Sequence, residues 1–287
     1  MLIAHLSDLH IRDHDDVIAL ESQLDRIVVR QVVHLAITGD LLDRWDPWLL
    51  AEVHDALAAR GLLDADRLTI LHGNHDLASS GGHPRRSVDL WRLALRFWDP
   101  PPLAAARKRA FYSAVQKRAA EVASIAPFTK VLSCGWRIAV IDTVPFPWWP
   151  LGVSREAITV RHAVGGVREQ ELNWLARLQR DRPLILLVHH YPLDVVPYQW
   201  RPNGLLGRFV REVRVPMALP TRERERFWDA VIESGARLVL CGHVHRARLQ
   251  WNGGVAVGLN GQSGADWAGR TIAYYDLSRP ALEQIQE

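Results

Sequence analysis

The chain has 287 residues, 48% hydrophobic and 23% charged, which predicts a well-packed globular protein of one α/β domain, or one domain with an embedded subdomain. It has no run of about 18 apolar residues, so we expect no transmembrane helix, although peripheral contact with a membrane stays open. The formal net charge of +3 is too small to indicate a dedicated nucleic-acid-binding module. The sequence predicts no particular oligomeric state.

Strands and helices alternate over the first third of the chain, and each predicted strand ends in a polar motif. We expect strands at residues 2–6, 32–38 and 68–71, and helices at residues 17–30 and 47–60. Gly61 follows the second helix and is a typical helix-ending residue. In such a repeat the loops beyond the carboxyl ends of the strands meet at one edge of a sheet, where we expect a functional site.

The rest of the chain is less regular but continues the α/β pattern. We expect helices at residues 87–98, 103–124, 168–180 and 221–234, and strands at residues 128–132, 137–142, 184–188, 238–241 and, in short pieces, 247–277. Thr221 is predicted to cap the last helix, with Glu223 in its first turn. The Arg-Lys-Arg sequence at residues 107–109 is interpreted as a solvated helix face.

Five short motifs carry the residues that indicate chemistry. They are Asp8-Leu9-His10, Gly39-Asp40-Leu41-Leu42-Asp43, Gly73-Asn74-His75-Asp76, His189-His190 and Gly242-His243-Val244-His245. Such donors suit two adjacent divalent ions, and oxygen mixed with imidazole favours manganese, iron or zinc over calcium or magnesium. On an extended strand end, Asp8 and His10 would project to the same side and could share one ion. Asp40 could bridge two ions, whereas a turn could direct His243 and His245 to different ions.

The order and spacing of these motifs, over residues 8–245, resemble the calcineurin-like metallophosphoesterase superfamily. The resemblance implies an α/β fold, a four-layer α/β/β/α sandwich of two mixed β-sheets flanked by helices. Residues 1–287 would form a single metallophosphoesterase domain, with a helical insertion around residues 87–125 and a substrate-cap insertion around residues 191–220. An Arg-lined, solvated loop is the alternative for the second segment. The chain departs from many relatives at His72, where they have Pro, and we interpret this His as structural.

The resemblance also implies a role for each motif residue. The first metal ion would be bound by Asp8, His10, Asp40 and His245, and the second by Asp40, Asn74, His189 and His243. A hydroxide held between the two ions would attack phosphorus in line. His75 would stabilise the transition state or protonate the leaving oxygen, and Asp43 would orient its imidazole. A neighbouring carboxylate favours the cationic imidazole that such proton donation requires.

Substrate contacts are expected from residues around these motifs. Arg44 follows Asp43, as in related protein phosphatases where the matching Arg contacts phosphate. His189 is preferred over His190 as the ligand because it is closer to the strand end, which leaves His190 for the substrate or for support of the ligands. Trp149 belongs to a Trp-rich loop that is either an exposed apolar lip or a buried latch. Arg201 belongs to the segment around residues 191–220.

The favoured hypothesis is a phosphodiesterase that acts on nucleotide-type substrates, because the chain is short and retains His75 for departure of the leaving group. A UDP-diacylglucosamine-type lipid-precursor pyrophosphatase is the alternative suggested by the Trp-rich loop and the Arg-rich segment. A nuclease is less favoured, and a non-catalytic metal-binding scaffold is disfavoured because every ligand position is filled. Cys134 and Cys241 lack CxxC spacing and are interpreted as reduced core residues, which favours a cytoplasmic location.

Overall fold

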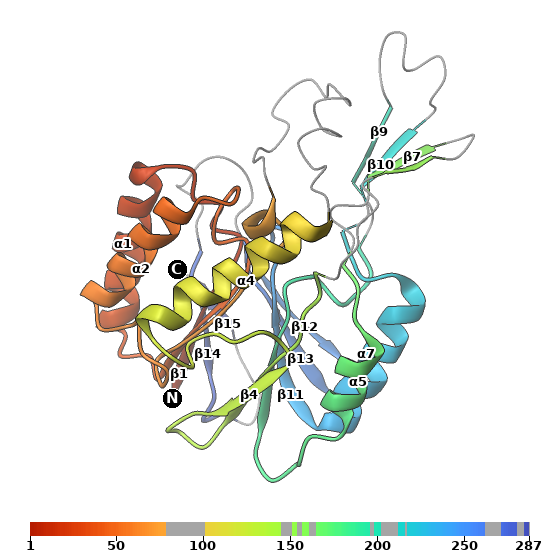
Figure 1. Ribbon diagram of the computed structural model, residues 1–287. Coiled ribbons are helices and arrows are strands. Elements are labelled where there is room, and N and C mark those ends of the chain that lie inside the picture. Colours follow the sequence, from red (N-terminus) through yellow and green to blue (C-terminus); the bar gives the residue numbers. More distant parts are fainter. Residues whose placement is uncertain are drawn as a thin grey trace.

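Two mixed β-sheets lie face to face between two layers of helices in the computed structural model of the chain (Figure 1). The structure describes residues 1–78, 101–144, 151–153, 157–160, 165–195, 198–201, 212–215, 217–261, 271–279 and 284–286. The four-layer sandwich expected from the sequence is therefore confirmed. The predicted helix at residues 87–98 lies outside the described residues.

The first sheet has five strands in the order β15-β14-β1-β2-β3. Its strands are β1 (Leu2–Leu6), β2 (His34–Thr38), β3 (Leu68–Leu71), β14 (Ala273–Asp276) and β15 (Gln284–Gln286). β1, β2 and β3 are parallel, so their carboxyl ends reach the same edge of the sheet. The helices on its outer face are α1 (His14–Val29), α2 (Pro47–Ala59) and α4 (Pro101–Arg118). A short 3-10 helix, η1 (His75–Leu77), follows β3.

The second sheet has six strands in the order β12-β13-β11-β8-β5-β4. Its strands are β4 (Phe128–Val131), β5 (Arg137–Val140), β8 (Leu184–Leu187), β11 (Ala236–Cys241), β12 (Arg248–Asn252) and β13 (Val255–Leu259). The central strands β5, β8, β11 and β13 are parallel to one another, whereas the edge strands β4 and β12 pair antiparallel with β5 and β13. Helices α5 (Glu169–Ala176) and α7 (Thr221–Ser234) cover its outer face.

Strict alternation of side chains explains why the central strands are apolar along their whole length. In β8, Ile185 and Leu187 pack between the two sheets, whereas Leu184 and Leu186 pack against the helices. A strand buried on both faces needs apolar residues at every position. The sandwich therefore has three cores, one between the sheets and one under each helix layer.

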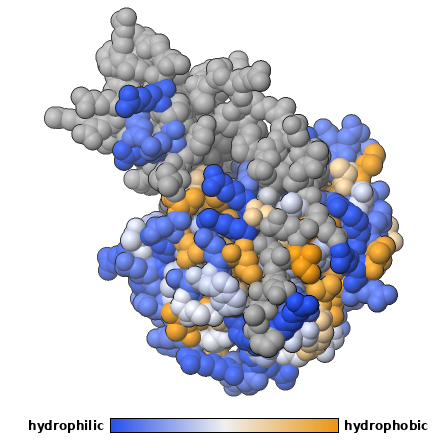
Figure 2. Space-filling view, turned by 180° about the vertical axis from the view of Figure 1, so that it is seen from behind, coloured by the Kyte–Doolittle hydropathy of each residue, from blue (hydrophilic) through white to orange (hydrophobic). Residues whose placement is uncertain are grey.

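A third, smaller sheet projects from the sandwich (Figure 1). Its order is β6-β7-β10-β9, formed by β6 (Leu151–Val153), β7 (Ala157–Val160), β9 (Tyr198–Trp200) and β10 (Glu212–Val215). Parallel pairing of β7 with β10 joins the segment after the Trp-rich loop to the segment around residues 191–220. Two regions that are far apart in the sequence therefore form one sheet. Hydrophilic residues are visible on this third sheet, whereas hydrophilic and hydrophobic residues intermingle over the sandwich face below it (Figure 2).

Two local expectations are wrong. Helix α7 begins at Thr221, but its N-cap is Pro220 and no side chain caps it, although Glu223 does lie in the first turn. Lys108 of α4 is only 8% exposed, so residues 107–109 are not simply a solvated face. The reason is that Lys108 shares a helix face with Tyr112, four residues later, and that face is buried. No helix among the described residues has both the length and the apolar character needed to cross a membrane.

Candidate metal centre

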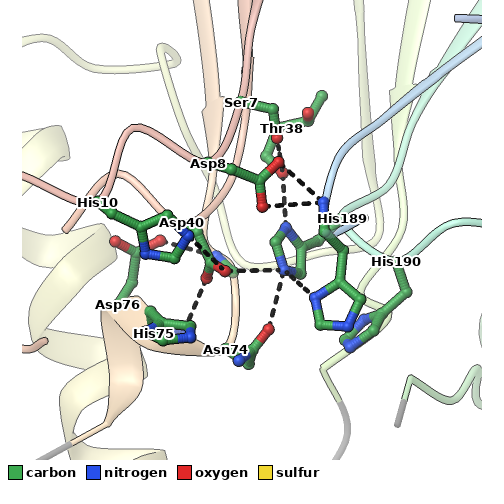
Figure 3. A network of polar contacts seen from close by, with 12 residues as sticks. Ser7, Asp8, His10, Thr38, Asp40, Asn74, His75, Asp76, His189 and His190 are labelled. Carbon is green, nitrogen blue, oxygen red and sulfur yellow. Dashed lines mark hydrogen bonds and ion pairs between the residues drawn. The ribbon is translucent and has the colours of Figure 1, made fainter. Parts of the chain in front are cut away.

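The predicted ligands converge where the carboxyl ends of the two large sheets meet (Figure 3). One group follows strands of the five-stranded sheet: Asp8 and His10 after β1, Asp40 after β2, and Asn74 after β3. The other group follows strands of the six-stranded sheet: His189 after β8, and His243 and His245 after β11. The sandwich itself therefore brings five separate motifs to one place.

Five of the seven predicted ligands have left-handed backbone conformations. The φ angles are 53° at Asp8, 45° at His10, 49° at Asp40, 74° at His243 and 53° at His245. Residues other than glycine adopt this region rarely, and such strained conformations cluster at functional sites. Asp8 and His10 do bring their donor atoms to one cluster, as expected, but not on an extended strand end. Their loop instead turns sharply, fixed by hydrogen bonds from the Asp8 and His10 N–H groups to the Gly39 and Asp40 carbonyls.

One cluster of donor atoms is formed by Asp8, His10 and His245, with Asp40 beside it. The Nε2 atoms of His10 and His245 are 3.1 Å apart. His245 Nε2 lies 3.5 Å from Asp8 Oδ1, and His10 Nε2 lies 3.8 Å from Asp40 Oδ2. These four side chains match the set expected for the first ion.

A second cluster surrounds His189. Its Nε2 lies 3.0 Å from Asn74 Oδ1, 3.2 Å from His243 Nδ1 and 3.4 Å from Asp40 Oδ2. Asp40 thus lies between the two clusters. His243 and His245 face different clusters, as a turn at the end of β11 allows.

The spacing of these atoms fits two divalent cations. Ligand atoms that share one ion at bonds of about 2.1 Å lie roughly 3.0 to 3.5 Å apart, in octahedral to tetrahedral geometry. The closest separations in both clusters fall in that range. Asp40 Oδ2 is buried and accepts no hydrogen bond from any residue that the structure describes. A buried carboxylate oxygen in this state requires a cationic partner.

Charge is concentrated in the same place. Burial opposes ionisation of Asp40, but the imidazoles of His189 and His75 outweigh it and hold the Asp40 pKa well below its usual value. Burial likewise lowers the pKa of His189, but the Asp40 and Asp8 carboxylates outweigh it and raise that pKa to about 9. The carboxylates thus attract positive charge strongly, and a metal cation can take the place of the proton.

Close backbone approach explains the glycines in two of the motifs. Gly39 has φ of 96°, and a Cβ there would lie 2.6 Å from the Gly73 nitrogen and 2.7 Å from His189 Nδ1. A side chain at either glycine would separate the loops that carry Asp40 and Asn74, because a Cβ at Gly73 would clash with Asp40.

His75 lies beside the first cluster. One of its ring nitrogens, an Asp40 carboxylate oxygen and a His10 ring nitrogen all lie within 4.8 Å of one another. Its Nδ1 donates to the Asp43 backbone carbonyl at 3.0 Å, whereas the Asp43 carboxylate is 3.8 Å away. Asp43 therefore holds this imidazole mainly through its backbone.

Two further polar residues support the cluster without being predicted. Thr143, after β5, accepts hydrogen bonds from the backbone N–H groups of His189 and His190 and contacts His190 Nδ1 at 3.1 Å. The buried carboxylate of Asp76 accepts from Leu42 N and Gly73 N, both at 2.8 Å, and so links two motif loops. Asp76 belongs to the Gly-Asn-His-Asp motif, which is a usable signal, but nothing in the local sequence marks Thr143.

The expected substrate contacts are distributed unevenly. His190 is fully buried beside the second cluster, with its ring 4.3 Å from that of His243. Arg44 and Arg201 are exposed, the latter at the end of β9 in the projecting sheet. Trp149 lies outside the described residues.

Comparison with known proteins identifies the family. The profile of the calcineurin-like phosphoesterase family matches residues 1–247. The chain belongs to this family. Members of the family use a dinuclear divalent metal centre, and the two donor clusters fit such a centre. The chain is therefore a dinuclear metal-dependent phosphoesterase, which is a hydrolase.

Solved structures share the fold at low sequence identity. A dimetal phosphatase from Danio rerio aligns with a TM-score of 0.59 at 12% identity, over 96% of this chain and 92% of that one. TT1561 of Thermus thermophilus aligns with a TM-score of 0.54 at 15% identity, over 99% of this chain and 97% of that one. No curated protein has a significant sequence match to the chain.

Proposed function

We propose that this phosphoesterase is a phosphodiesterase for small nucleotide-type substrates. The observation that carries the proposal is the position of His75, an imidazole beside the donor clusters that is not needed as a ligand. Hydrolysis of a diester expels an alkoxide, and a positioned acid that protonates it accelerates the reaction by about 10²- to 10⁴-fold.

In this proposal Asp8, His10, Asp40 and His245 hold one cation, and Asp40, Asn74, His189 and His243 hold the other. Two cations bound there would activate a water and neutralise charge that develops on the phosphate oxygens. The donor set suits manganese, iron or zinc. The shared position of Asp40 between the clusters supports its role as the bridge.

Hydrogen bonding supports His189 rather than His190 as the ligand. His189 Nδ1 faces the Thr38 carbonyl at 2.9 Å, and a carbonyl can only accept, so the free lone pair is on Nε2, toward Asn74 and Asp40. The two lone pairs of Thr143 Oγ1 are used by the His189 and His190 N–H groups, so its hydroxyl proton goes to His190 Nδ1. The neutral His190 ring then carries its proton on Nε2, as a donor for a phosphate oxygen.

The same logic assigns the proton-transfer atom of His75. Nδ1 donates to the Asp43 carbonyl and keeps its proton, so the atom that gives or takes a proton is Nε2. Asp43 Oδ1 lies 3.8 Å from His75 Nδ1 and 3.7 Å from His10 Nδ1, so this carboxylate is close to both rings.

Substrate contacts and compartment complete the proposal. Arg44 and Arg201 are exposed guanidinium groups that can bind phosphate, and the projecting sheet is proposed as a substrate cap. Trp149 is proposed to contact an apolar part of the substrate on sequence grounds alone. Cys134 and Cys241 are both free, which supports a reducing, cytoplasmic compartment.

Substitution of His75 separates chemistry from metal binding. We expect His75→Gln to lower kcat by about 10²- to 10⁴-fold on a phosphodiester, since the general acid is lost. Metal content, measured by mass spectrometry of the folded protein, should remain that of the wild type. Full activity of the variant would contradict the role of His75. Rates on p-nitrophenyl mono- and diesters, cyclic nucleotides, UDP-linked lipids and single-stranded DNA would test the substrate class, and a preference for monoesters would overturn it.

A further inference from the structure

A buried ionic cluster lies next to the metal centre and joins its two halves. Lys108 of α4 pairs with Asp142, which follows β5 in the six-stranded sheet. The other carboxylate oxygen of Asp142 lies 3.4 Å from His72 Nε2, and His72 follows β3 in the five-stranded sheet. His72 Nδ1 and the Tyr112 hydroxyl are 2.8 Å apart. All four residues are at most 8% exposed.

Each end of this cluster is one or two residues away from the metal centre. Asn74 lies two residues after His72, on the same loop. Thr143 directly follows Asp142 and holds the backbones of His189 and His190. Asn74 Oδ1 and His189 Nε2, which come from different sheets, are 3.0 Å apart. The cluster therefore bridges the two loops whose spacing determines the second donor cluster.

Helix α4 has a second contact with the same region. Arg107 donates from Nη1 to the Leu77 carbonyl at 2.9 Å, at the end of η1, which begins with His75. Adjacent basic residues of one helix thus bind the loop after β3 and the loop after β5. Removal of two charges from water offsets most of the attraction in a buried ion pair, so such a pair is better suited to fixing geometry than to adding stability.

We propose that Lys108, through Asp142 and His72, is a positioning residue that sets the distance between Asn74 and His189 and thereby the affinity for the second cation. The inference rests on the dinuclear centre of the proposed function. His72 would then be a functional part of the support, in place of the structural role expected from the sequence. Loss of residues that orient metal ligands typically weakens metal binding by about 10- to 100-fold.

Calorimetric titration with Mn²⁺ tests the proposal without reference to activity. Lys108→Met should weaken one of two binding steps by about 10- to 100-fold and leave the other unchanged. The double variant Lys108→Met/Asp142→Asn removes both charges of the pair together, so it should fold even if the single variant does not, and it should show the same selective loss. Lys108→Arg should restore much of the affinity. Arg118→Met is the matched control, since Arg118 is on the same helix but pairs with Asp55 at the surface.

Electron paramagnetic resonance adds a readout of spacing. Two Mn²⁺ ions that share Asp40 give an exchange-coupled spectrum, and the double variant at equal loading should give mainly uncoupled Mn²⁺. A folded double variant with two unchanged binding steps and a wild-type spectrum would overturn the positioning role and leave the proposed function intact. Wild-type protein that binds fewer than two Mn²⁺ ions would overturn both.

Discussion

The two large sheets contribute different chemistry to the metal centre. Among the proposed ligands, the five-stranded sheet supplies both carboxylates, Asp8 and Asp40, together with Asn74 and His10. The six-stranded sheet supplies only imidazoles, from His189, His243 and His245. All of the formal negative charge of the ligand set therefore comes from one half of the sandwich.

This difference explains why the halves need cations between them. Burial, reinforced by the charge of His189, lowers the pKa of His243 to about 3, so this imidazole is neutral at physiological pH. The pKa of His189 is raised only because the carboxylates of the opposite sheet outweigh burial. Protons on imidazoles such as His189 balance the buried carboxylates when no metal is bound, and a divalent cation can replace these protons and leave the imidazoles as neutral ligands.

The largest expected effect comes from a change to Asp40, which the five-stranded sheet supplies and which lies between both clusters. Asp40→Asn keeps the shape of the side chain but removes its charge. We expect the loss of both cations and a fall in kcat on the order of a thousandfold or more, because charge stabilisation in the transition state disappears. His243→Ala, in the imidazole half, should retain one cation. Metal analysis and steady-state kinetics check both variants, and two bound ions in Asp40→Asn would contradict the asymmetry.

Two adjacent histidines at the end of the six-stranded sheet, His189 and His190, provide a finer test. His189→Ala should weaken binding of one cation by at least about a hundredfold, since a ligand is lost. His190→Ala should leave metal affinity within a few-fold of the wild type and raise KM for the phosphoester, since only a hydrogen-bond donor to the substrate is lost. Mn²⁺ titrations and Michaelis–Menten curves for the pair distinguish these effects. The reverse pattern would make His190 the ligand and invalidate the tautomer assignment.

The asymmetry also shows what sequence could and could not predict. Strands such as Leu2–Leu6 and Leu68–Leu71 are predicted at their observed bounds because strands buried on both faces are continuous apolar runs between polar residues. The donor residues are predicted to converge because each follows such a strand. The left-handed conformations at Asp8 and His243 were not predicted, since they depend on contacts between loops far apart in the chain, such as the hydrogen bond from the His243 N–H to the Asp8 carboxylate.

Support from distant segments was missed for the same physical reason. Thr143 has no recognisable motif around it, and its role arises only when β5 pairs with β8. Lys108 stands in a basic stretch that resembles any solvated helix face, and its burial is decided by packing of α4. Pairing of β7 with β10 joins residues about fifty positions apart, with no local pattern to indicate the partner.

The smallest expected effect concerns a buried histidine of the charged half that lies away from the metal centre. Burial, and to a lesser extent the charge of Lys130, lowers the pKa of His34 to about 3 from its ordinary 6.5. The unfolded chain therefore binds a proton at His34 between pH 6.5 and about 3 that the folded chain does not, and stability contributed by the neutral ring is lost as pH falls through this window.

His34→Asn keeps a donor for the Asp66 carbonyl and should make the free energy of unfolding depend less steeply on pH, by at most about 1.4 kcal/mol per pH unit. Urea unfolding at several pH values between 4.5 and 6.5 measures this slope. His14→Asn is the control, because His14 is exposed and its pKa is raised, not lowered, by its hydrogen bond to Glu52. An identical slope in wild type and His34→Asn would show that His34 is protonated within the fold and would contradict the stabilising role of its neutral ring.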